Sequence, residues 1–284
     1  MPNAIDFLAQ SQNADGGWSY RASAQSVSYV EATAAVLLAL PNSAEHARTS
    51  GKDFLLSLQH ADGGWGIASI DSESGWMTAW AVRALAIFSD TRDAVERGVH
   101  WLLATEGILV DDVIGHAQTL KLFKIDTALH GWPWQPGDAA WVHPTALAML
   151  ALIASGHGDA SRVFDGASYL FDRAVPNGGW NIGNPWMIDK QIPATIQDTA
   201  IALQALRALG RFDNDSRVID AIAYLRQAVA HAQTPAELAW GILALREWNV
   251  EVGNSIDRLN ALQSGNGIWQ SNPFITAMAI ASQK

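Results

Sequence analysis

The sequence predicts an all-α protein built from a repeated pair of helices. A glycine-tryptophan turn follows a helical stretch four times, as QNADGGW ending at Trp18, QHADGGW at Trp65, VPNGGW at Trp180 and QSGNGIW at Trp269. The segments between the turns are apolar on nearly every helical face, and strand-like alternation never extends beyond a few residues. A unit of roughly forty to fifty residues that recurs in this way is typical of a repeat fold.

Each turn supplies residues that suit the end of a helix. Paired glycines after Asp15 and Asp62 tolerate positive φ, so the chain can reverse direction there. The following tryptophan ring can fold back over the helix end, and a nearby glutamine can bond free backbone groups of the next repeat. We therefore expect the four turn tryptophans to join repeats rather than to contact a substrate.

Two kinds of helix alternate along the chain. Six apolar segments are expected at 29–40, 76–85, 142–152, 196–206, 235–245 and 274–281. Because a helix without a polar face is buried, and none of these could span a bilayer, they are expected to form the inner layer of a double ring. The outer layer is expected from more polar segments near 6–10, 47–58, 94–104, 160–174, 216–230 and 255–263.

Composition favours one domain over residues 1–284. The chain is long enough to bury a large core, and no linker-like or low-complexity stretch divides it. It has no cysteine, which excludes disulfides and thiolate metal ligands, and its net charge of −10 gives nucleic acid no electrostatic attraction. The first residues lack signal-peptide character, so we expect a cytoplasmic protein, and we expect no cofactor or metal.

The repeats resemble those of the squalene-hopene cyclase and protein prenyltransferase superfamily. Its members alternate Q-x-x-D-G-G-W turns with D-T-A-x-A-L helices, and the likeness covers nearly the whole chain. The resemblance implies a single α/α toroid with about six inner and six outer helices around a central cavity. It also implies a small-molecule isoprenoid as the substrate or ligand.

The chemistry of that superfamily is only partly matched by these residues. Its prenyltransferases hold zinc with Asp, Cys and His, so a chain without cysteine does not fit that activity. Its class II terpene cyclases protonate an alkene or epoxide with the middle acid of a D-x-D-D-T-A motif. The corresponding stretch, 195–200, has Gln197 at that place, and an amide cannot act as the acid.

Other ionisable residues are candidates for the missing acid. Aligning the inner helices places six residues at one position: Glu31, Trp76, His143, Gln197, Ala236 and Phe274. If that position faces the cavity, as the resemblance implies, Glu31 and His143 become candidate catalytic residues, and Asp198, one residue later, is a further candidate for the acid. Burial in an apolar cavity raises the pKa of a carboxyl group and keeps it protonated.

A structural role is the alternative for these residues. Acids in the first turn of a helix bond free backbone amides, so Glu31, Asp198 and Glu237 could instead be helix caps. His143, which precedes Pro144 at a helix start, could be a hydrogen-bonded core residue.

Aromatic residues outside the turns are the expected substrate contacts. Trp132, Trp134 and Trp141 in GWPWQPGDAAW, and Trp186 in GNPWMIDK, lie in loop-like segments. Aromatic faces stabilise a carbocation, although they also suit stacking on sugars or capping a core. The predicted substrate-binding residues are Trp76, Gln197, Phe274, Trp134, Trp141 and Trp186. A polar group of Asp111, Asp112 and His116 is a weak metal motif.

The sequence thus leaves three functional hypotheses. The first is a protonation-initiated, class II cyclase-like enzyme acting on a linear isoprenoid. The second is a non-catalytic toroid that binds an isoprenoid or a protein partner. The third is a polysaccharide lyase-like toroid, which the acidic charge balance disfavours because such substrates are polyanions. Peripheral membrane contact and the oligomeric state are left open.

Overall fold

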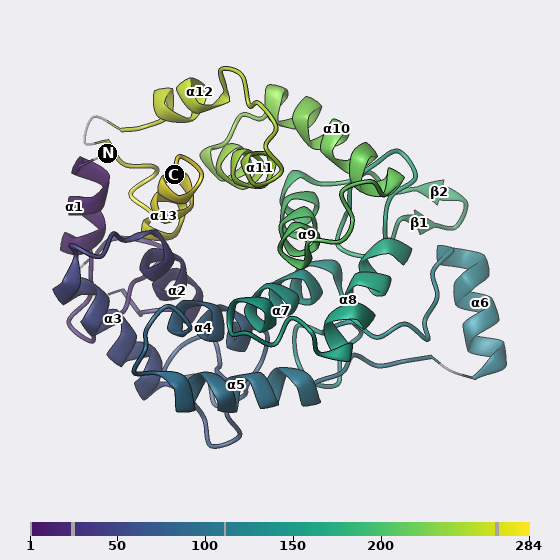
Figure 1. Ribbon diagram of the computed structural model, residues 1–284, viewed down its shortest axis with the longest axis horizontal. Helices are drawn as coiled ribbons and strands as arrows, with labels where there is room; N and C mark the ends of the chain where they lie inside the picture. The colour runs from purple at the N-terminus through teal and green to yellow at the C-terminus, as the bar shows by residue number, and fades with distance from the viewer. Residues whose placement is uncertain (1, 24–25, 111, 265–266) are drawn as a thin grey trace.

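The computed structural model describes residues 2–23, 26–110, 112–264 and 267–284, which form a closed double ring of helices (Figure 1). The inner helices are α2 (Val30–Ala39), α4 (Met77–Leu85), α7 (Val142–Ala154), α9 (Ile196–Leu209), α11 (Pro235–Glu247) and α13 (Pro273–Ala281). The outer helices are α1 (Pro2–Gln10), α3 (Glu45–Ser57), α5 (Arg92–Ala104), α8 (Ser161–Asp172), α10 (Ser216–His231) and α12 (Ser255–Ala261). Each inner helix packs against the next, and α13 packs against α2, which closes the ring.

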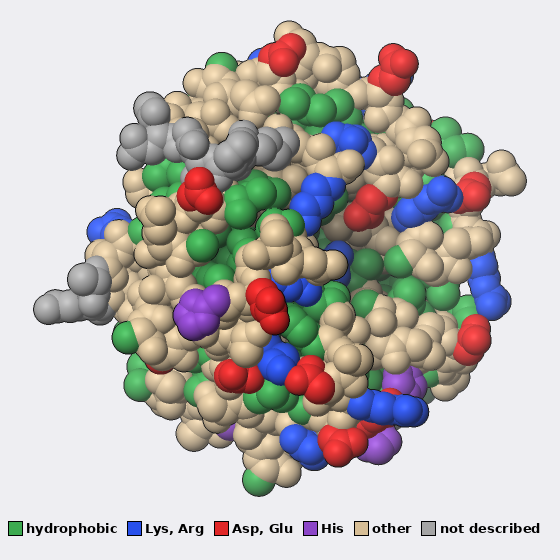
Figure 2. Space-filling view, turned by 60° about the vertical axis from the view of Figure 1, so that its left-hand side comes forward, with side chains coloured by type: hydrophobic (Ala, Val, Ile, Leu, Met, Phe, Trp, Pro, Cys, Tyr) green, Lys and Arg blue, Asp and Glu red, His purple; other side chains and the backbone are tan. Residues whose placement is uncertain are grey.

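The core lies between the two layers of the ring. Helix α7 is buried from Val142 to Leu152, and the other inner helices are buried over most of their length, as their apolar sequences require. Figure 2 shows that one face of the molecule is hollowed in its middle, where hydrophobic side chains gather and charged side chains surround them. Within the described residues, no helix combines the length and the apolar character that crossing a membrane requires.

Each turn tryptophan joins an outer helix to the inner helix that follows it. Its indole N–H donates to a carbonyl near the end of the preceding outer helix, at 2.6–2.8 Å. Its backbone N–H donates to the hydroxyl of a buried threonine on the next inner helix. The pairs are Trp18 with Leu8 and Thr33, Trp65 with Leu55 and Thr78, Trp132 with Leu102 and Thr145, Trp180 with Leu170 and Thr199, and Trp269 with Leu259 and Thr276.

The glutamines of the first two turns connect successive outer helices. Gln12 Nε2 donates to the carbonyl of Ala47 in the first turn of α3, and Gln59 Nε2 donates to that of Ala94 in α5, both at 2.9 Å. These contacts confirm that the turns join repeats. The junction between α10 and α11 is built differently, because Arg258 from α12 donates to the carbonyl of Ala230 at the end of α10.

The interpretation of Trp132 as a loop aromatic is wrong, because this residue is a fifth turn tryptophan. Its indole reaches back 30 residues to the Leu102 carbonyl, whereas the indole of Trp65 reaches back 10 residues to that of Leu55. An insertion that contains helix α6 (Val113–Phe123) separates α5 from its turn and hides the repeat spacing.

The insertion lies outside the ring and was not predicted. None of the α6 side chains is buried, and Asp112 caps the helix by accepting from the backbone N–H of Gly115 at 2.8 Å. Two short antiparallel strands, β1 (Trp186–Met187) and β2 (Lys190–Gln191), lie beside α6 (Figure 1). Apart from this two-residue pairing, the fold is the predicted all-α toroid.

We predict that Trp132→Phe lowers the free energy of unfolding by about 1–3 kcal/mol, because the Leu102 carbonyl loses its partner inside the core. Urea denaturation followed by circular dichroism measures this change. Trp141→Phe is the matched control, since the Trp141 indole forms no hydrogen bond among the described residues. An equal loss in both variants would contradict the joining role of Trp132.

Candidate functional site

The aligned sequence positions lie where the inner helices begin. Five of the six are two residues before the threonine that bonds a turn tryptophan, as Glu31 is before Thr33 and Trp76 before Thr78, whereas Ala236 precedes Leu238. Two residues correspond to about 200° of helical rotation, so a side chain opposite the outward-facing threonine points into the ring. The aromatic and ionisable side chains at this position therefore converge at the N-terminal end of the ring. They are Glu31, Trp76, His143 and Phe274.

Glu31 is held by side chains rather than by its own helix end. The hydroxyl of Tyr20 donates to Glu31 Oε2, whereas α2 begins without any side-chain cap. Burial raises the pKa of the Glu31 carboxyl group, and the donors Tyr20 and Trp80 lower it in part. Trp80 Nε1 has no hydrogen bond of normal geometry among the described residues, so it is a donor still available near this carboxylate.

Aromatic rings surround this carboxylate on neighbouring inner helices. The Phe274 ring from α13 makes edge-on contacts with Tyr20 and Trp80, at centroid distances of 6.0 and 6.1 Å. Tyr20 also packs against Tyr29, at 4.9 Å. Glu31, Trp76 and Phe274 are only partly buried, so this group reaches solvent at the N-terminal end of the ring.

His143 lies in a second aromatic group that is continuous with the first through α4. Its ring stacks on Trp134 at 5.4 Å and meets Trp76 and Trp240 edge-on at 5.8 and 6.0 Å. Burial disfavours the charged imidazole and lowers the pKa of His143 to about 4. The imidazole is therefore neutral near pH 7 and can accept a proton.

We call these two groups the N-terminal cluster, defined by Glu31, His143, Tyr20, Trp76, Trp80, Trp134, Trp240 and Phe274. The cluster ends at a filled layer one turn further into the ring. Trp80 and Trp240 are 1% and 3% exposed, and Leu147 and Ile201 are fully buried at the same level. The centre of the ring is thus closed in its middle, and the cluster opens at one end.

Asp198 is engaged mainly as a helix cap. The hydroxyl of Thr195 donates to Asp198 Oδ2 at 2.8 Å and accepts from the Asp198 backbone N–H, and Thr234 and Glu237 repeat this box on α11. Burial raises the pKa of the Asp198 carboxyl group. Its Oδ1 lies 3.9 Å from His143 Nδ1, too far for a hydrogen bond. The capping alternative therefore describes Asp198 and Glu237 but not Glu31.

The remaining predicted substrate contacts are dispersed. Gln197 is exposed at the rim of the ring, and Trp134 belongs to the cluster. Trp141 instead lines a separate pocket of about 320 Å³ beside Ile125 and Tyr169, on the outer side. Trp186 packs over the ammonium group of Lys124 at the end of α6, at 5.1 Å. The structure therefore does not bring Trp141 and Trp186 to the N-terminal cluster.

Three members of the cluster were missed from the sequence. Trp80 and Trp240 lie four residues after positions 76 and 236, so the same helix face carries them, and that spacing could have revealed them. Tyr20 enters from the loop after the first turn, and no repeat signal marks it.

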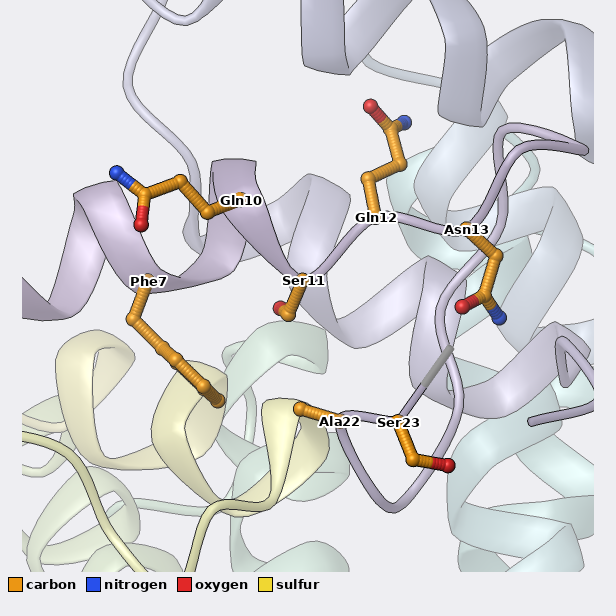
Figure 3. A pocket seen from close by; sticks show the side chains of 7 residues that line it. All are labelled: Phe7, Gln10, Ser11, Gln12, Asn13, Ala22 and Ser23. Carbon is orange, nitrogen blue, oxygen red and sulfur yellow. The ribbon is translucent and has the colours of Figure 1, made fainter. Parts of the chain in front are cut away.

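A further pocket of about 340 Å³ lies between α1 and that loop. Figure 3 shows Phe7 pointing towards Ala22 across it, and none of the seven labelled side chains is titratable. This pocket offers no group for acid-base chemistry.

Comparisons with known proteins identify the fold. The family model of the squalene-hopene cyclase C-terminal domain matches residues 1–112. The type II terpene cyclase MstE from Scytonema superposes with a TM-score of 0.69 at 16% identity, covering 99% of this chain and 95% of MstE. The chain has a squalene-hopene cyclase-like toroid fold. A search of curated protein sequences gave no match.

Two further structures show what this toroid resembles. An MstE variant in complex with its substrate, geranylgeranyl dihydroxybenzoate, gives a TM-score of 0.68 at 18% identity, with 99% of this chain and 94% of that chain covered. An α-1,6-mannanase from Salegentibacter gives 0.63 at 9% identity, with 99% and 98% covered. At these identities the likeness establishes the fold alone, so the chemistry has to be argued from the site.

The structure describes two of the three residues in the polar group that lies in the insertion of this squalene-hopene cyclase-like toroid. Asp111 lies outside the described residues, Asp112 caps α6, and His116 Nδ1 lies 3.1 Å from the hydroxyl of Thr127. Among the described residues, no group of three or more His, Asp or Glu side chains could hold a metal ion.

We predict that Glu31→Gln becomes more stable relative to the wild type as the pH rises above 4.5, the ordinary pKa of the group. A raised folded-state pKa contributes stability that is present at low pH and is lost as the pH rises through it. Thermal unfolding of both proteins across this pH range measures the difference. If the difference in stability between the two proteins were the same at every pH, the pKa of Glu31 would not be raised in the folded state.

His143→Phe is expected to have the opposite pH dependence. A pKa lowered from 6.5 to about 4 costs the folded state up to about 3 kcal/mol as the pH falls through that window, and phenylalanine removes this loss. Chemical denaturation at pH 7, 5.5 and 4 compares the two proteins. His231→Phe, at an exposed position, is the control and should leave the pH dependence unchanged.

Proposed function

We propose that this toroid cyclises a linear isoprenoid by protonating it, with Glu31 as the acid. One observation carries the proposal above the others: Glu31 is a partly buried carboxyl group that does not cap its helix and that aromatic rings from neighbouring elements surround. Desolvation raises the pKa of this carboxyl group and so favours its protonated form, which acid catalysis requires.

The donors around Glu31 support the proton transfer itself. The carboxyl proton passes to one carbon of a terminal alkene, and the electron pair of the π bond forms the new C–H bond. A tertiary carbocation and a carboxylate result. Tyr20, which donates to Glu31 Oε2, and the free Trp80 N–H stabilise that carboxylate, so they lower the barrier to giving up the proton.

The aromatic groups suit the cation that follows. Each ring closure uses the electron pair of another alkene to form a C–C bond and moves the positive charge along the chain. The faces of Trp76, Trp80 and Phe274 can stabilise that charge without reacting with it. Neutral His143, stacked on Trp134, is positioned to accept the final proton, which restores an alkene and leaves the overall reaction an isomerisation.

The substrate class is supported by the fold and by the composition of the cluster. MstE, which shares this fold, takes a geranylgeranyl compound as its substrate. The cluster around Glu31 is aromatic, as an apolar chain requires.

Because Gln197 stands where the resemblance predicts the acid, the non-catalytic isoprenoid-binding toroid is the competing function. The cytoplasmic location, peripheral membrane contact and the single-domain boundary stay predictions.

Incubation with linear isoprenoids, with and without a diphosphate group, tests this proposal. We expect cyclic products from the wild type, and in D₂O each product should carry one deuterium at the carbon that was protonated first. Glu31→Gln should lose at least about 100-fold in rate, because the general acid is removed. Mass spectrometry of the extracted products measures both outcomes.

Asp198→Asn is the matched control, since asparagine can still accept at the cap and Asp198 is engaged with Thr195. It should retain most of the activity. Unchanged isoprenoid in every wild-type reaction, with binding still detectable, would instead establish the non-catalytic toroid. Loss of activity in Asp198→Asn with activity retained in Glu31→Gln would instead assign the proton to Asp198.

A further inference from the structure

Polar side chains from three inner helices gather at the opposite, C-terminal end of the ring. Arg83 on α4 and Gln204 on α9 each lie seven residues after the aligned positions at the N-terminal end, and Glu247 lies eleven residues after Ala236 on α11. Seven and eleven residues are close to whole helical turns, so these side chains share the inner face. Helices α4 and α11 stand opposite each other in the ring, and α9 is next to α11 (Figure 1).

Gln204 is a buried amide without a partner. It is 1% exposed, and neither its Oε1 nor its Nε2 has a hydrogen bond among the described residues. An unsatisfied donor and acceptor in a buried place are costly, and the folded state tolerates them chiefly where water or a ligand completes them. Gln204 thus offers one acceptor and two donors inside the ring.

Arg83 and Glu247 carry opposite charges that do not meet. Within the described part of the chain, the Arg83 guanidinium forms no hydrogen bond and no ion pair. Burial lowers the pKa of Arg83, and the charge of Glu247 opposes this only in part. Burial likewise raises the pKa of Glu247, opposed by Arg83 and by Arg207. Both residues are half-buried, and two such charged groups that attract each other without contact leave a place for a bridging group.

This end of the ring is separate from the N-terminal cluster. The filled layer of Trp80, Leu147, Ile201 and Trp240 lies between them. The apolar residues at the level of Arg83 are Leu38, Leu150 and Leu243. A ligand here would therefore contact apolar walls, one cation, one carboxyl group and one amide.

We propose that the C-terminal end of the ring binds a small zwitterion that carries a carboxylate and an amino group, the chemistry of a free amino acid. The ligand carboxylate accepts from Arg83 and from Gln204 Nε2. The ligand ammonium donates to the Glu247 carboxylate and to Gln204 Oε1. All three polar side chains are then satisfied at once.

Other ligand chemistries fit these residues less well. A phosphate or diphosphate would bring several negative charges against the Glu247 carboxylate, with Arg83 as its direct cation. The nearby Arg207 is already engaged, since it donates to the Glu247 backbone carbonyl and to Asp213, both at 3.0 Å. A simple carboxylate leaves Glu247 unpaired, and a simple amine leaves Arg83 unpaired.

Isothermal titration calorimetry of the full chain tests the site with six named probes. Glycine, 4-aminobutanoate and 6-aminohexanoate vary the distance between the two charges, whereas propanoate, propylamine and pyrophosphate carry one kind of charge. We expect one of the three zwitterions to bind at least about tenfold more tightly than all single-charge probes, since a charged hydrogen bond is lost with each of those. Tightest binding of pyrophosphate, or no binding of any zwitterion at about 10 mM, would overturn the proposal.

Variants distinguish binding from a structural role. Arg83→Met and Gln204→Leu should each weaken the best zwitterion at least about tenfold. Both should leave the melting temperature of the unliganded protein unchanged or higher, because neither side chain has a hydrogen-bond partner to lose and Gln204→Leu also removes a buried unpaired amide. Arg226→Met, on the exposed side of α10, is the control. Retained binding in Arg83→Met, or a lowered melting temperature in both variants, would show that these residues hold the ring together instead.

Discussion

The double hydrogen bond of the turn tryptophan is the interaction on which the toroid depends. The indole N–H of each turn tryptophan donates to a carbonyl at the end of an outer helix. The backbone N–H of the same residue donates to a threonine hydroxyl on the next inner helix. Helix ends leave carbonyl groups without partners, and burying them requires such donors. The same pair of bonds recurs at Trp18, Trp65, Trp132, Trp180 and Trp269 and joins five of the six helix pairs, and the six inner helices close on themselves.

Closure of the ring creates two ends with different chemistry. At the N-terminal end, Glu31 and His143 lie among aromatic rings, and burial pushes both pKa values towards the neutral forms. At the C-terminal end, burial disfavours the charged forms of Arg83 and Glu247, while the attraction between them favours those forms in part. Ionisable groups whose pKa values are shifted by burial lower the stability of the folded state, and they are typical of binding and catalytic sites. The likeness to both a terpene cyclase and a mannanase shows that the toroid itself does not select between chemistries.

Desolvation also separates residues that look equivalent in the sequence. Glu31, Asp198 and Glu237 all lie in the first turn of an inner helix, yet Asp198 and Glu237 bond the threonine that caps their own helix. Tyr29 stands at the cap position of α2 and has no side-chain cap, so Glu31 turns to Tyr20. Ser28 stands three residues before Glu31, but its hydroxyl donates to Asp15 Oδ1, so no capping box forms on α2.

The sequence by itself determined the fold class, the two helix layers and the helix position shared by Glu31, Trp76, His143 and Phe274, because helical periodicity and the repeat spacing are local properties of the chain. The resemblance to the cyclases, and not the spacing, implied that this position faces inward. It did not reveal Trp132 as a turn residue, since the α6 insertion breaks the spacing, nor did it place Trp141 and Trp186 outside the cluster. Only the tertiary structure decided which acid is free, brought Tyr20 from a loop onto Glu31, and set Arg83 opposite Glu247. These are contacts between elements far apart in the chain, and closure of the ring fixes them.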